Sequence, residues 1–570
     1  MMRTMLWVMA STTWVPGVLA SPATQQSWPP GEPVKWTCVY DGSVVPGQSV
    51  PYWSGGPGPD TTRAVENGVL RIVDRGTQKG ALHCYSQGWA VDPDHGAVFE
   101  ARVKVIANDG RSGVALVGAD GKHEVGTTLY PDRITIGRPA KTYAMSTTDD
   151  FHVYRLAIRG NDYCIWVDGK LVMDGRGQHT HPAHKGRNVI MFGSISSAAR
   201  SEALWDSVRY AVLGRKPAPP RIAGAQDVII YKKEGIYACF PSLMRLEDGT
   251  LYTSFGTRVR RSHIDGTGGS ARYVSKDNGH TWQPHQGKAP LNPAWRCNDG
   301  SLAHARARGW RYVPASRRDE FAKQDITVRH VREGVVAYLQ GAYARRSTDG
   351  GKTWQTQDID LPPHRGLMCH NLSETCKMKC GVLLNAAYGE LKADKIGRSF
   401  ILRSEDNGKT WTFGPLAADP EGKVRLNETA LVENDRGEVI AMIRSEPPTG
   451  GHLFHTISKD RGKTWSTPRR TKIWGYPANL LRLKDGRILC TYGYRRHPQG
   501  VRAVLSRDGG HTWDVNRLIV IRDDHFGGGS HLGYPISVEL APGKIFTIYY
   551  ITLTDGVTHV AGTHWDLPPS

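Results

Sequence analysis

The sequence predicts an all-β protein in which a jelly-roll β-sandwich is followed by a six-bladed β-propeller. Three observations support this fold class. The chain has 570 residues, which is too long for a single ordinary hydrophobic core. It contains 64 glycines, 34 prolines and 17 tryptophans, as expected for a soluble protein rich in turns and aromatic residues. An eight-residue motif also recurs five times in its C-terminal half, which indicates a repeat fold.

The first twenty residues have the pattern of a signal peptide. Arg3 precedes an apolar run from Leu6 to Ala20 that ends in small residues, with cleavage expected after Ala20 or Ala23. No later segment is long and apolar enough to span a bilayer. We therefore expect residues 1–20 to be removed and the protein to be secreted, periplasmic or bound at the cell surface.

Residues 28–213 alternate apolar and polar side chains, which is the pattern of half-buried β-strands. The clearest segments begin at Val98, Tyr154, Cys164 and Leu204. Their arrangement resembles the laminin-G or concanavalin-like jelly roll, a β-sandwich often used to bind glycans. The sequence leaves open whether this sandwich binds calcium, and no motif in the chain requires a metal or another cofactor.

Composition narrows the classes of partner. The formal net charge is +19, but the 73 lysines and arginines are spread along the whole chain rather than gathered in a tract. We therefore expect no nucleic-acid partner, and a basic surface suits an acidic glycan. The nine cysteines include one close group, Cys369 and His370 with Cys376 and Cys380, whose spacing fits no zinc motif. Buried thiols or a local disulfide are the favoured interpretation.

A proline-rich segment, residues 214–224, is predicted to be a stiff linker to a second domain over residues 225–565. In that domain the motif Ser-x-Asp-x-Gly-x-Thr-Trp recurs. Asp and Gly suit a tight turn in which the carboxylate accepts backbone N–H groups, and the Trp anchors the turn against its own sheet. The five copies occupy residues 275–282, 347–354, 404–411, 458–465 and 506–513.

A second, looser repeat has two short apolar strands around a turn rich in Asp and Gly. Its six copies are spaced 49 to 72 residues apart, which is the length of a four-stranded propeller blade. A strand over residues 227–231 is expected to complete the last blade. The copies begin near residues 240, 298, 370, 427, 476 and 534.

This strand order predicts where functional residues gather. The starts of first strands, the ends of second strands and the loops after them share one rim of a propeller. Four arginines end second strands on that rim, namely Arg258, Arg444, Arg495 and Arg496. Converging guanidinium groups bind a carboxylate in fork geometry, which we favour over separate surface salt bridges.

The same rim carries candidate catalytic residues. Tyr476 and Tyr534 begin first strands in matching Gly-Tyr-Pro contexts, and Glu428 occupies the comparable place in the preceding unit. A Tyr and a Glu aimed at one axis are a candidate nucleophile and base, whereas the alternative is ordinary packing. Asp265 lies in the loop after Arg258 and is a candidate proton donor, with loop capping as the alternative.

The octapeptides are identified as the Asp boxes of the sialidase (neuraminidase) superfamily, and the resemblance covers the whole predicted propeller. In that family an arginine triad binds the sialic-acid carboxylate, a Tyr activated by a Glu attacks the anomeric carbon, and an Asp is the acid/base. The resemblance assigns these roles to Tyr534, Glu428 and Arg444, and to Asp265 with Arg258.

One departure from the family pattern bears on the substrate. Cys239 stands where the family has its first triad arginine. Arg245 is a poor substitute, because six residues along a strand is roughly 20 Å. Arg495, Arg496 and Arg522 are better candidates, and Arg522, on the connection to the predicted nucleophile, is chosen as the third arginine.

The resemblance implies a secreted exo-glycosidase that releases terminal sialic acid or a related acidic sugar with retention. A phenol that loses its proton in step with attack avoids the repulsion between an anionic nucleophile and the substrate carboxylate. Two alternatives remain. One is a glycosidase or polysaccharide lyase of the same fold acting on another, uronic-acid-containing polymer. The other is a glycan-binding protein without catalysis, in which Tyr534, Glu428 and Asp265 do not converge. Sequons at Asn371 and Asn427 are present, and a glycan at Asn427 would contradict the site.

Overall fold

The structure, a computed structural model, describes residue 28 and residues 34–55, 61–76, 83–138, 140–195, 199–215, 218–368, 375–446, 451–526 and 531–568. The expected signal peptide, the pair Cys369-His370 and the sequon at Asn371 lie outside these residues. The cysteines within them are free thiols, and all but Cys380 are buried. None of the helices described is both long and apolar enough to cross a membrane.

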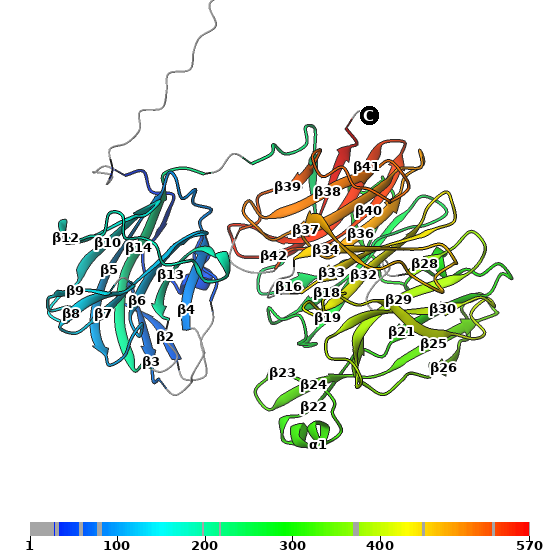
Figure 1. Ribbon diagram of the computed structural model, residues 1–570, viewed down its shortest axis with the longest axis horizontal. Coiled ribbons are helices and arrows are strands. Elements are labelled where there is room, and N and C mark those ends of the chain that lie inside the picture. The colour runs from blue at the N-terminus through cyan, green and yellow to red at the C-terminus, as the bar shows by residue number, and fades with distance from the viewer. Residues whose placement is uncertain are drawn as a thin grey trace, which may run out of the picture.

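The regular structure of the first half consists of two antiparallel sheets (Figure 1). The eight-stranded sheet contains β1 (Cys38–Tyr40), β2 (Thr61–Glu66), β3 (Val69–Asp74), β5 (Ala97–Asn108), β10 (His152–Arg159), β11 (Asp162–Val167), β12 (Lys170–Asp174) and β14 (Ser201–Val212). The six-stranded sheet contains β4 (His83–Gly88), β6 (Ala115–Asp120), β7 (Glu124–Tyr130), β8 (Arg133–Gly137), β9 (Ala140–Ala144) and β13 (Asn188–Ser194). Two short 3-10 helices, η1 (Pro46–Gln48) and η2 (His184–Gly186), lie in the connections.

The two sheets share one hydrophobic core. Between Ala101 and Val105, β5 buries every second side chain, as its alternating sequence predicts. Val103 of this strand belongs to the same buried cluster as Leu116 of β6 and Ile190 of β13 in the other sheet. Face-to-face packing of the two sheets is therefore what removes their apolar residues from water.

Apart from a three-stranded insertion, the described residues of the second half form six sheets that follow one another along the chain. The first has β16 (Tyr237–Cys239), β17 (Met244–Arg245), β18 (Leu251–Arg258), β19 (Gly268–Ser275) and β20 (Gln283–Pro284). The second has β21 (Leu302–Ala307), β25 (Ala342–Ser347) and β26 (Gln355–Asp358), preceded by η3 (Pro293–Trp295). The third has β27 (His364–Met368), β28 (Thr375–Lys377), β29 (Leu383–Leu391), β30 (Arg398–Ser404) and β31 (Thr412–Ala417).

The remaining three sheets have four strands each. The fourth has β32 (Leu426–Glu433), β33 (Val439–Ser445), β34 (His452–Ser458) and β35 (Arg469–Trp474). The fifth has β36 (Ala478–Arg482), β37 (Ile488–Tyr494), β38 (Gly500–Ser506) and β39 (Ile519–Arg522). The sixth has β15 (Gln226–Tyr231), β40 (Gly533–Ala541), β41 (Lys544–Thr552) and β42 (Thr558–Asp566), so a strand from the start of this half pairs with the last strand, as expected from the sequence.

The octapeptides form matching turns between the last two strands of the first five sheets. In the first copy Ser275 donates to Asp277, and Asp277 accepts from both the N–H and the hydroxyl of Thr281. The same contacts recur in the other four copies. Trp282 packs beyond its own sheet, with its ring 5.9 Å from that of Phe546 in β41. The repeated motif is therefore a structural turn that also links neighbouring sheets.

An additional small unit interrupts the second sheet. It contains β22 (Trp310–Pro314), η4 (Ala315–Arg317), α1 (Arg318–Lys323), β23 (Val328–Arg332) and β24 (Val335–Leu339). This insertion, which projects from the lower edge of the second half in Figure 1, accounts for the longest spacing between repeats. Its Tyr312 donates to the carbonyl of Ile264, so the insertion contacts the loop that contains Asp265.

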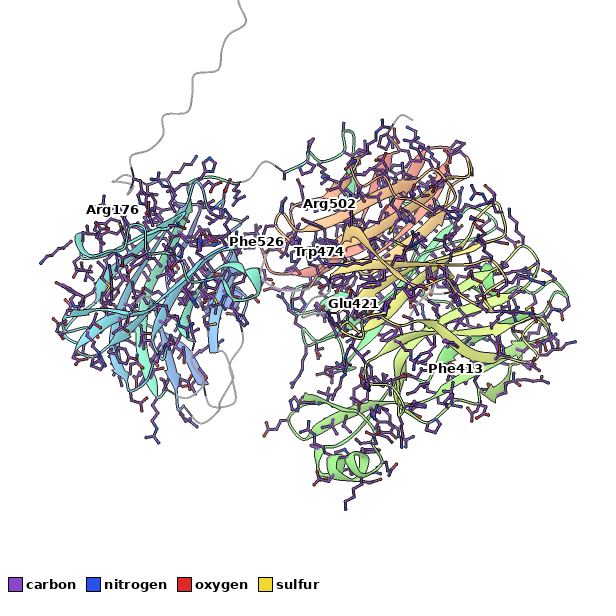
Figure 2. The ribbon with its side chains drawn as sticks, in the orientation of Figure 1. Arg176, Phe413, Glu421, Trp474, Arg502 and Phe526 are labelled. Atoms are coloured by element: carbon purple, nitrogen blue, oxygen red, sulfur yellow. The ribbon has the colours of Figure 1, made fainter. Side chains whose placement is uncertain are left out.

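The two halves are in contact near Tyr52. Its N–H donates to the carbonyl of Thr554 at 3.0 Å, and its hydroxyl accepts from Arg261 at 3.1 Å. Phe526, on the side of the second half that faces the sandwich (Figure 2), lies 6.3 Å from the ring of Tyr52. His497 packs against the backbone of Gly88, where a side chain on Gly88 would collide with the imidazole.

Candidate active site

Tyr534 lies at the start of β40 in an unusual backbone conformation. Its φ is 51°, in the left-handed region that residues other than glycine rarely adopt. The pairing of β40 with β41 shifts register between Gly533 and Ile536, so the strand bulges at this tyrosine. Phe240, which also has a positive φ of 55°, packs edge-on against it with ring centroids 4.7 Å apart. Two strained aromatic residues in contact are typical of a functional site.

Tyr534, Glu428 and Arg444 form a connected trio. The Tyr534 hydroxyl donates a short hydrogen bond to Glu428 Oε1. Glu428 Oε2 accepts from Arg444 Nη1 at 2.7 Å, and the same nitrogen lies 3.5 Å from the phenol oxygen. Glu428 occupies another register shift, between Leu426 and Thr429 of β32. Local irregularities therefore direct both the phenol and the carboxylate to one point.

The surroundings of the trio keep the phenol protonated and the carboxylate paired. Glu428 is buried, and its side chain is only 7% exposed. Enclosure of the phenol, followed by the negative charge of Glu428, raises the pKa of Tyr534 well above its ordinary value. The resting state is thus a neutral phenol bonded to a carboxylate that can accept its proton.

Tyr476 and Arg495 lie next to this trio, and the five residues together are called the Tyr534 cluster below. The ring of Tyr476 lies between two guanidinium groups, with Cζ of Arg444 4.6 Å and Cζ of Arg495 4.8 Å from its centroid. Arg495 Nη2 also donates to the carbonyl of Leu532, two residues before Tyr534. The positive charge of Arg495 acts on Tyr534 by lowering its pKa in opposition to burial. Two arginines therefore lie beside the phenol.

Residues of the first sheet lie on another side of the Tyr534 cluster, at the end of β18 and in the loop that follows this strand. Arg258, at the end of β18, lies over the ring of Phe240 at 5.2 Å. His263, in the following loop, lies 5.3 Å from the same ring and within hydrogen-bond distance, 3.1 Å, of Tyr237 Oη. Tyr237 in turn contacts His531 Nδ1 at 3.1 Å. The phenol of Tyr237 therefore links the imidazoles of His263 and His531.

The pKa of His263 responds to the charges around Tyr534. Burial, and then the positive charges of Arg495, Arg444 and Arg258, lowers the pKa of His263 to about 4, while Glu428 opposes the shift. Sequence reasoning missed His263 because it sought a carboxylate in this loop. The signal that it overlooked is a histidine only two positions before Asp265.

Asp265 is held away from the trio by its own partners. Its Oδ1 accepts from the N–H of Thr267 and from Arg332 of the insertion, both at 3.0 Å, and Arg260 lies 3.7 Å away. Burial would raise its pKa, but the hydrogen bonds from Thr267 and the charges of Arg332 and Arg260 outweigh it and hold the pKa below its usual range. Asp265 is therefore ion-paired with Arg332 and Arg260, and among the described residues its hydrogen bonds and ion pairs do not include Tyr534 or Glu428.

Arg522 and Arg496 lie outside the cluster, contrary to their selection from the sequence. Arg522 is buried in ion pairs with Asp524 at 2.7 Å and Asp227 at 3.2 Å, because the strand that closes the sixth sheet brings Asp227 to it. Arg496 is exposed and lies over the ring of Trp474 at 4.0 Å.

Cys239, the residue before Phe240, supplies no charge to the Tyr534 cluster. Its side chain is fully buried, and burial raises the pKa of the thiol to about 12. A neutral thiol cannot replace a guanidinium group. Arg245 points elsewhere and donates to the carbonyls of Glu539 and Leu540, so it does not compensate.

A small cleft of about 80 Å³ is lined by Asn427, the residue before Glu428, but not by the side chains of the trio. The side-chain amide of Asn427 donates to Glu446, which also lines this cleft, at 2.7 Å. Asn427 is buried and its amide nitrogen is hydrogen-bonded, which does not fit an attached glycan. The cleft is lined further by Trp310 and Arg329 of the insertion, by Arg365, Glu390 and Arg425, and by neighbouring backbone.

Comparisons with known proteins find similarities to part of this chain. Residues 328–547 match the family model described as a BNR repeat-like domain. A curated sialidase from Micromonospora viridifaciens is 24% identical over 357 residues, which are 58% of this chain and 54% of the relative. The chain thus spans about half the length of that relative.

Solved structures of similar shape include two bacterial proteins. A protein of unknown function from Dyadobacter fermentans is 28% identical with a TM-score of 0.49, over 61% of this chain and all of the other. The NanB sialidase from Streptococcus pneumoniae is 13% identical with a TM-score of 0.38, over 83% of this chain and 95% of the other. The sequence comparisons therefore relate the octapeptide region to BNR-repeat proteins and to a sialidase.

Proposed function

We propose that this protein is a glycoside hydrolase of sialidase type that removes a terminal acidic sugar from glycans with retention of configuration. The observation that carries the proposal is the trio in which the Tyr534 phenol donates to Glu428 and Glu428 accepts from Arg444. A hydroxyl bonded to a buried carboxylate is the arrangement of an activated nucleophile and its base.

The proposed reaction has two steps. Glu428 takes the phenol proton as Tyr534 Oη bonds to the anomeric carbon, and the glycosidic C–O bond breaks with proton donation to the leaving oxygen. Water then attacks the same carbon and gives a proton to the group that protonated the leaving oxygen, the bond between the sugar and Tyr534 breaks, and Glu428 returns its proton to the departing phenolate. Two inversions give net retention. Arg444 stabilises the Glu428 carboxylate before the proton arrives.

The acidic group of the sugar would be recognised by arginines. Arg444 and Arg495 flank Tyr476 beside the phenol, and Arg258 lies on the opposite wall across Phe240. Guanidinium groups bind carboxylates through paired hydrogen bonds. The neutral thiol of Cys239 supplies no such contact, which favours an acidic sugar held differently from sialic acid in the family pattern.

Two residues compete for the role of proton donor. Asp265, suggested by the sequence, is ionised and paired with Arg332. His263 packs against Phe240, which contacts Tyr534, and binding of an anionic substrate among Arg258, Arg444 and Arg495 would raise its low pKa by cancelling their charge. This substrate-dependent protonation favours His263 as the acid.

The remaining parts of the chain fit the same proposal. The six sheets would be the blades of a propeller closed by β15, and the cleft beside Asn427 would hold the rest of the glycan. The first half would be a jelly-roll domain that binds the polymer, and the protein would act after secretion.

The direct test measures release of 4-methylumbelliferone from an α-sialoside and from other acidic glycosides. Tyr534→Phe should abolish turnover, since it keeps the ring packing and removes the attacking oxygen. Tyr252→Phe is a matched control, because that buried hydroxyl lacks a hydrogen-bond partner among the described residues. Equal turnover by Tyr534→Phe and wild type, or no turnover of any acidic glycoside by wild type, contradicts the proposal.

Substrates with different leaving groups distinguish the two candidates for the acid. The aryl group of an aryl glycoside departs without protonation, whereas the sugar hydroxyl of a natural glycan must be protonated to depart. Loss of the acid should therefore reduce hydrolysis of a sialyl-oligosaccharide far more than that of the aryl sialoside. We expect this selective loss for His263→Ala and not for Asp265→Asn.

A second candidate function follows from Cys239. With this position uncharged, the cluster suits a uronic-acid polymer as well, and the reaction would then be hydrolysis or elimination at that sugar. Product analysis distinguishes these reactions, because only elimination creates an unsaturated uronate that absorbs ultraviolet light.

A further inference from the structure

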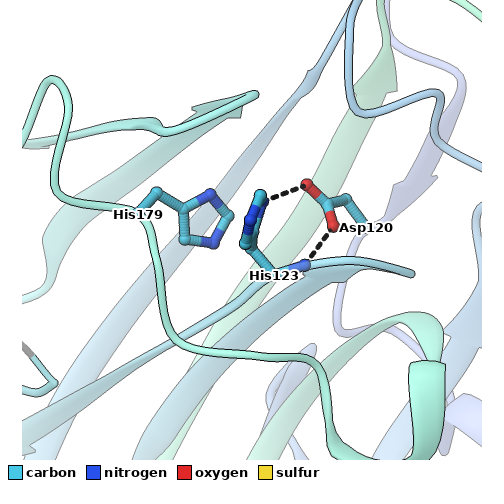
Figure 3. Close-up of side chains that lie close together, drawn as sticks. All are labelled: Asp120, His123 and His179. Atoms are coloured by element: carbon cyan, nitrogen blue, oxygen red, sulfur yellow. Dashed lines mark hydrogen bonds and ion pairs between the residues drawn. The ribbon is translucent and has the colours of Figure 1, made fainter.

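Three metal-binding side chains meet in the sandwich, far along the chain from the Tyr534 cluster. They are Asp120 at the end of β6, His123 in the turn before β7, and His179 in the connection between β12 and η2. Figure 3 shows the two imidazoles and the carboxylate turned toward one another. One ligand atom from each lies within 4.8 Å of the others.

The surrounding hydrogen bonds orient these three side chains but leave one ligand atom of each without a hydrogen bond. Asp120 Oδ1 accepts from the N–H groups of Lys122 and His123, which fixes the carboxylate, while its buried Oδ2 accepts no hydrogen bond from the described residues. His179 Nδ1 lies 3.2 Å from the carbonyl of Gly160, and a carbonyl can only accept. Nδ1 must therefore carry the proton, and Nε2 presents its lone pair.

Burial makes these open atoms costly unless something binds them. Asp120 and His179 are each only 2% exposed, and His179 Nε2 is buried without a partner. His123 Nδ1 is likewise buried and unpartnered, at 3.8 Å from Asp120 Oδ2, too far for a hydrogen bond. Buried polar atoms normally form hydrogen bonds, so three such atoms that lie close together without a hydrogen bond from any described residue indicate a cation site.

The donor set selects the kind of cation. Calcium and magnesium bind oxygen, whereas two imidazole nitrogens and one carboxylate oxygen suit zinc, with three protein ligands and one open position. Tetrahedral ligands at 2.0–2.2 Å stand roughly 3.3 Å apart, near the 3.8 Å between Asp120 Oδ2 and His123 Nδ1. The hydrogen bond from His179 to Gly160 is the outer contact that zinc-bound histidines usually make.

We propose that Asp120, His123 and His179 bind one zinc ion in the sandwich. The ion would join the turn between β6 and β7 to the connection that carries His179. Backbone contacts already hold these segments together, since the N–H of Glu124 donates to the carbonyl of His181 and His123 bridges Pro182. Zinc would therefore lock a connection between the two sheets. Sequence reasoning did not find it because the third ligand lies 56 residues beyond the second.

The test uses the full chain with no histidine tag, stripped with a chelator and passed through gel filtration after addition of zinc sulfate. Elemental analysis should give one zinc per chain, and zinc should raise the midpoint of thermal unfolding. His179→Ala and Asp120→Asn should weaken zinc binding at least about tenfold. His184→Ala, an exposed histidine on the same connection, should bind as wild type does.

The results of these binding experiments either support or overturn the zinc site. Variants that keep the circular dichroism of the metal-free wild type but lose zinc support the site. Zinc that does not co-elute with wild type, or equal binding by wild type and His179→Ala, overturns it. Binding of calcium chloride at the same stoichiometry, with zinc not competing, overturns the assignment to zinc.

Discussion

The octapeptide turns and the Tyr534 cluster both depend on carboxylates, but they are assembled over very different distances along the chain. In each turn the aspartate bonds a serine two positions before it and a threonine four positions after it. In the cluster, Glu428 bonds Arg444 on the next strand and Tyr534 from a different sheet, 106 positions away. The turn completes itself locally, whereas the cluster exists only when several sheets are in place.

The difference extends to what each carboxylate can do. The turn aspartates have their acceptor capacity filled by neighbours that stabilise the ionised form. Glu428 accepts from Arg444 and also from Tyr534, whose proton it could take. The repeated carboxylates therefore hold turns, whereas the unrepeated one is the carboxylate to which we assign chemistry in the proposed function. Substitutions and changes of pH test this division.

The largest effect is expected from Glu428→Gln. The amide cannot accept the phenol proton, so turnover of the acidic glycoside should fall by about 10²- to 10⁴-fold. Circular dichroism should stay that of wild type, because the amide keeps the volume and one acceptor. Steady-state kinetics with Asp460→Asn as control checks the division, and a comparable loss of turnover in both variants would break it.

A pH effect on stability should come next, from buried histidines of the second half. Burial, followed by nearby arginines, lowers the pKa of His455 to about 4 and of His304 to about 3. Their pKa in the unfolded chain is about 6.5. Between these values the unfolded chain binds more protons, so the free energy of unfolding is full above pH 6.5 and falls as pH drops toward 4.

The size of this effect is on the order of 3 kcal/mol for each such histidine. Thermal unfolding between pH 7.5 and 4 measures it, and His455→Gln should flatten the profile. A midpoint that does not change between pH 6.5 and 4.5 would contradict the burial of neutral imidazoles.

The sequence predicted those parts of the fold that are encoded by motifs within a short stretch of the chain. The octapeptides, their hydrogen bonds and the pairing of β15 with β42 follow from repeats that can be read along the chain. The insertion over residues 310–339 was not predicted, because it carries no repeat signal and appeared only as unusual spacing.

The candidate site was predicted in part for the same reason. Tyr534, Glu428 and Arg444 were found because each occupies an equivalent place in a repeat. Arg522 was misplaced, since its partner Asp227 comes from a strand almost 300 residues earlier and only the closure of the sixth sheet brings them together. The position of His263 depends on the packing of Phe240 and Tyr237, which no local pattern encodes.

A smaller effect on stability is expected for the octapeptide aspartates. Burial opposes but the hydrogen bonds from Thr464 and Ser458 prevail, and the pKa of Asp460 falls to about 2. Its contribution is present above about pH 4, the unfolded value, and is lost as pH falls toward 2. Asp460→Asn should lower the free energy of unfolding by about 1–3 kcal/mol at pH 7. Urea unfolding at pH 7 and pH 3 checks this, since the difference between the proteins should shrink at the lower pH.

The smallest effect is expected from Arg496→Ala, set against Arg495→Ala. Both arginines follow β37, but Arg495 lies beside Tyr534 and Tyr476 while Arg496 is exposed on Trp474. Removing Arg496 should change the free energy of unfolding by less than about 0.5 kcal/mol. It should also leave KM for the acidic glycoside unchanged, whereas Arg495→Ala should raise KM at least about tenfold by removing a charged contact. If both variants raise KM equally, the substrate extends over Trp474, and the boundary drawn between the cluster and its surroundings is wrong on that side.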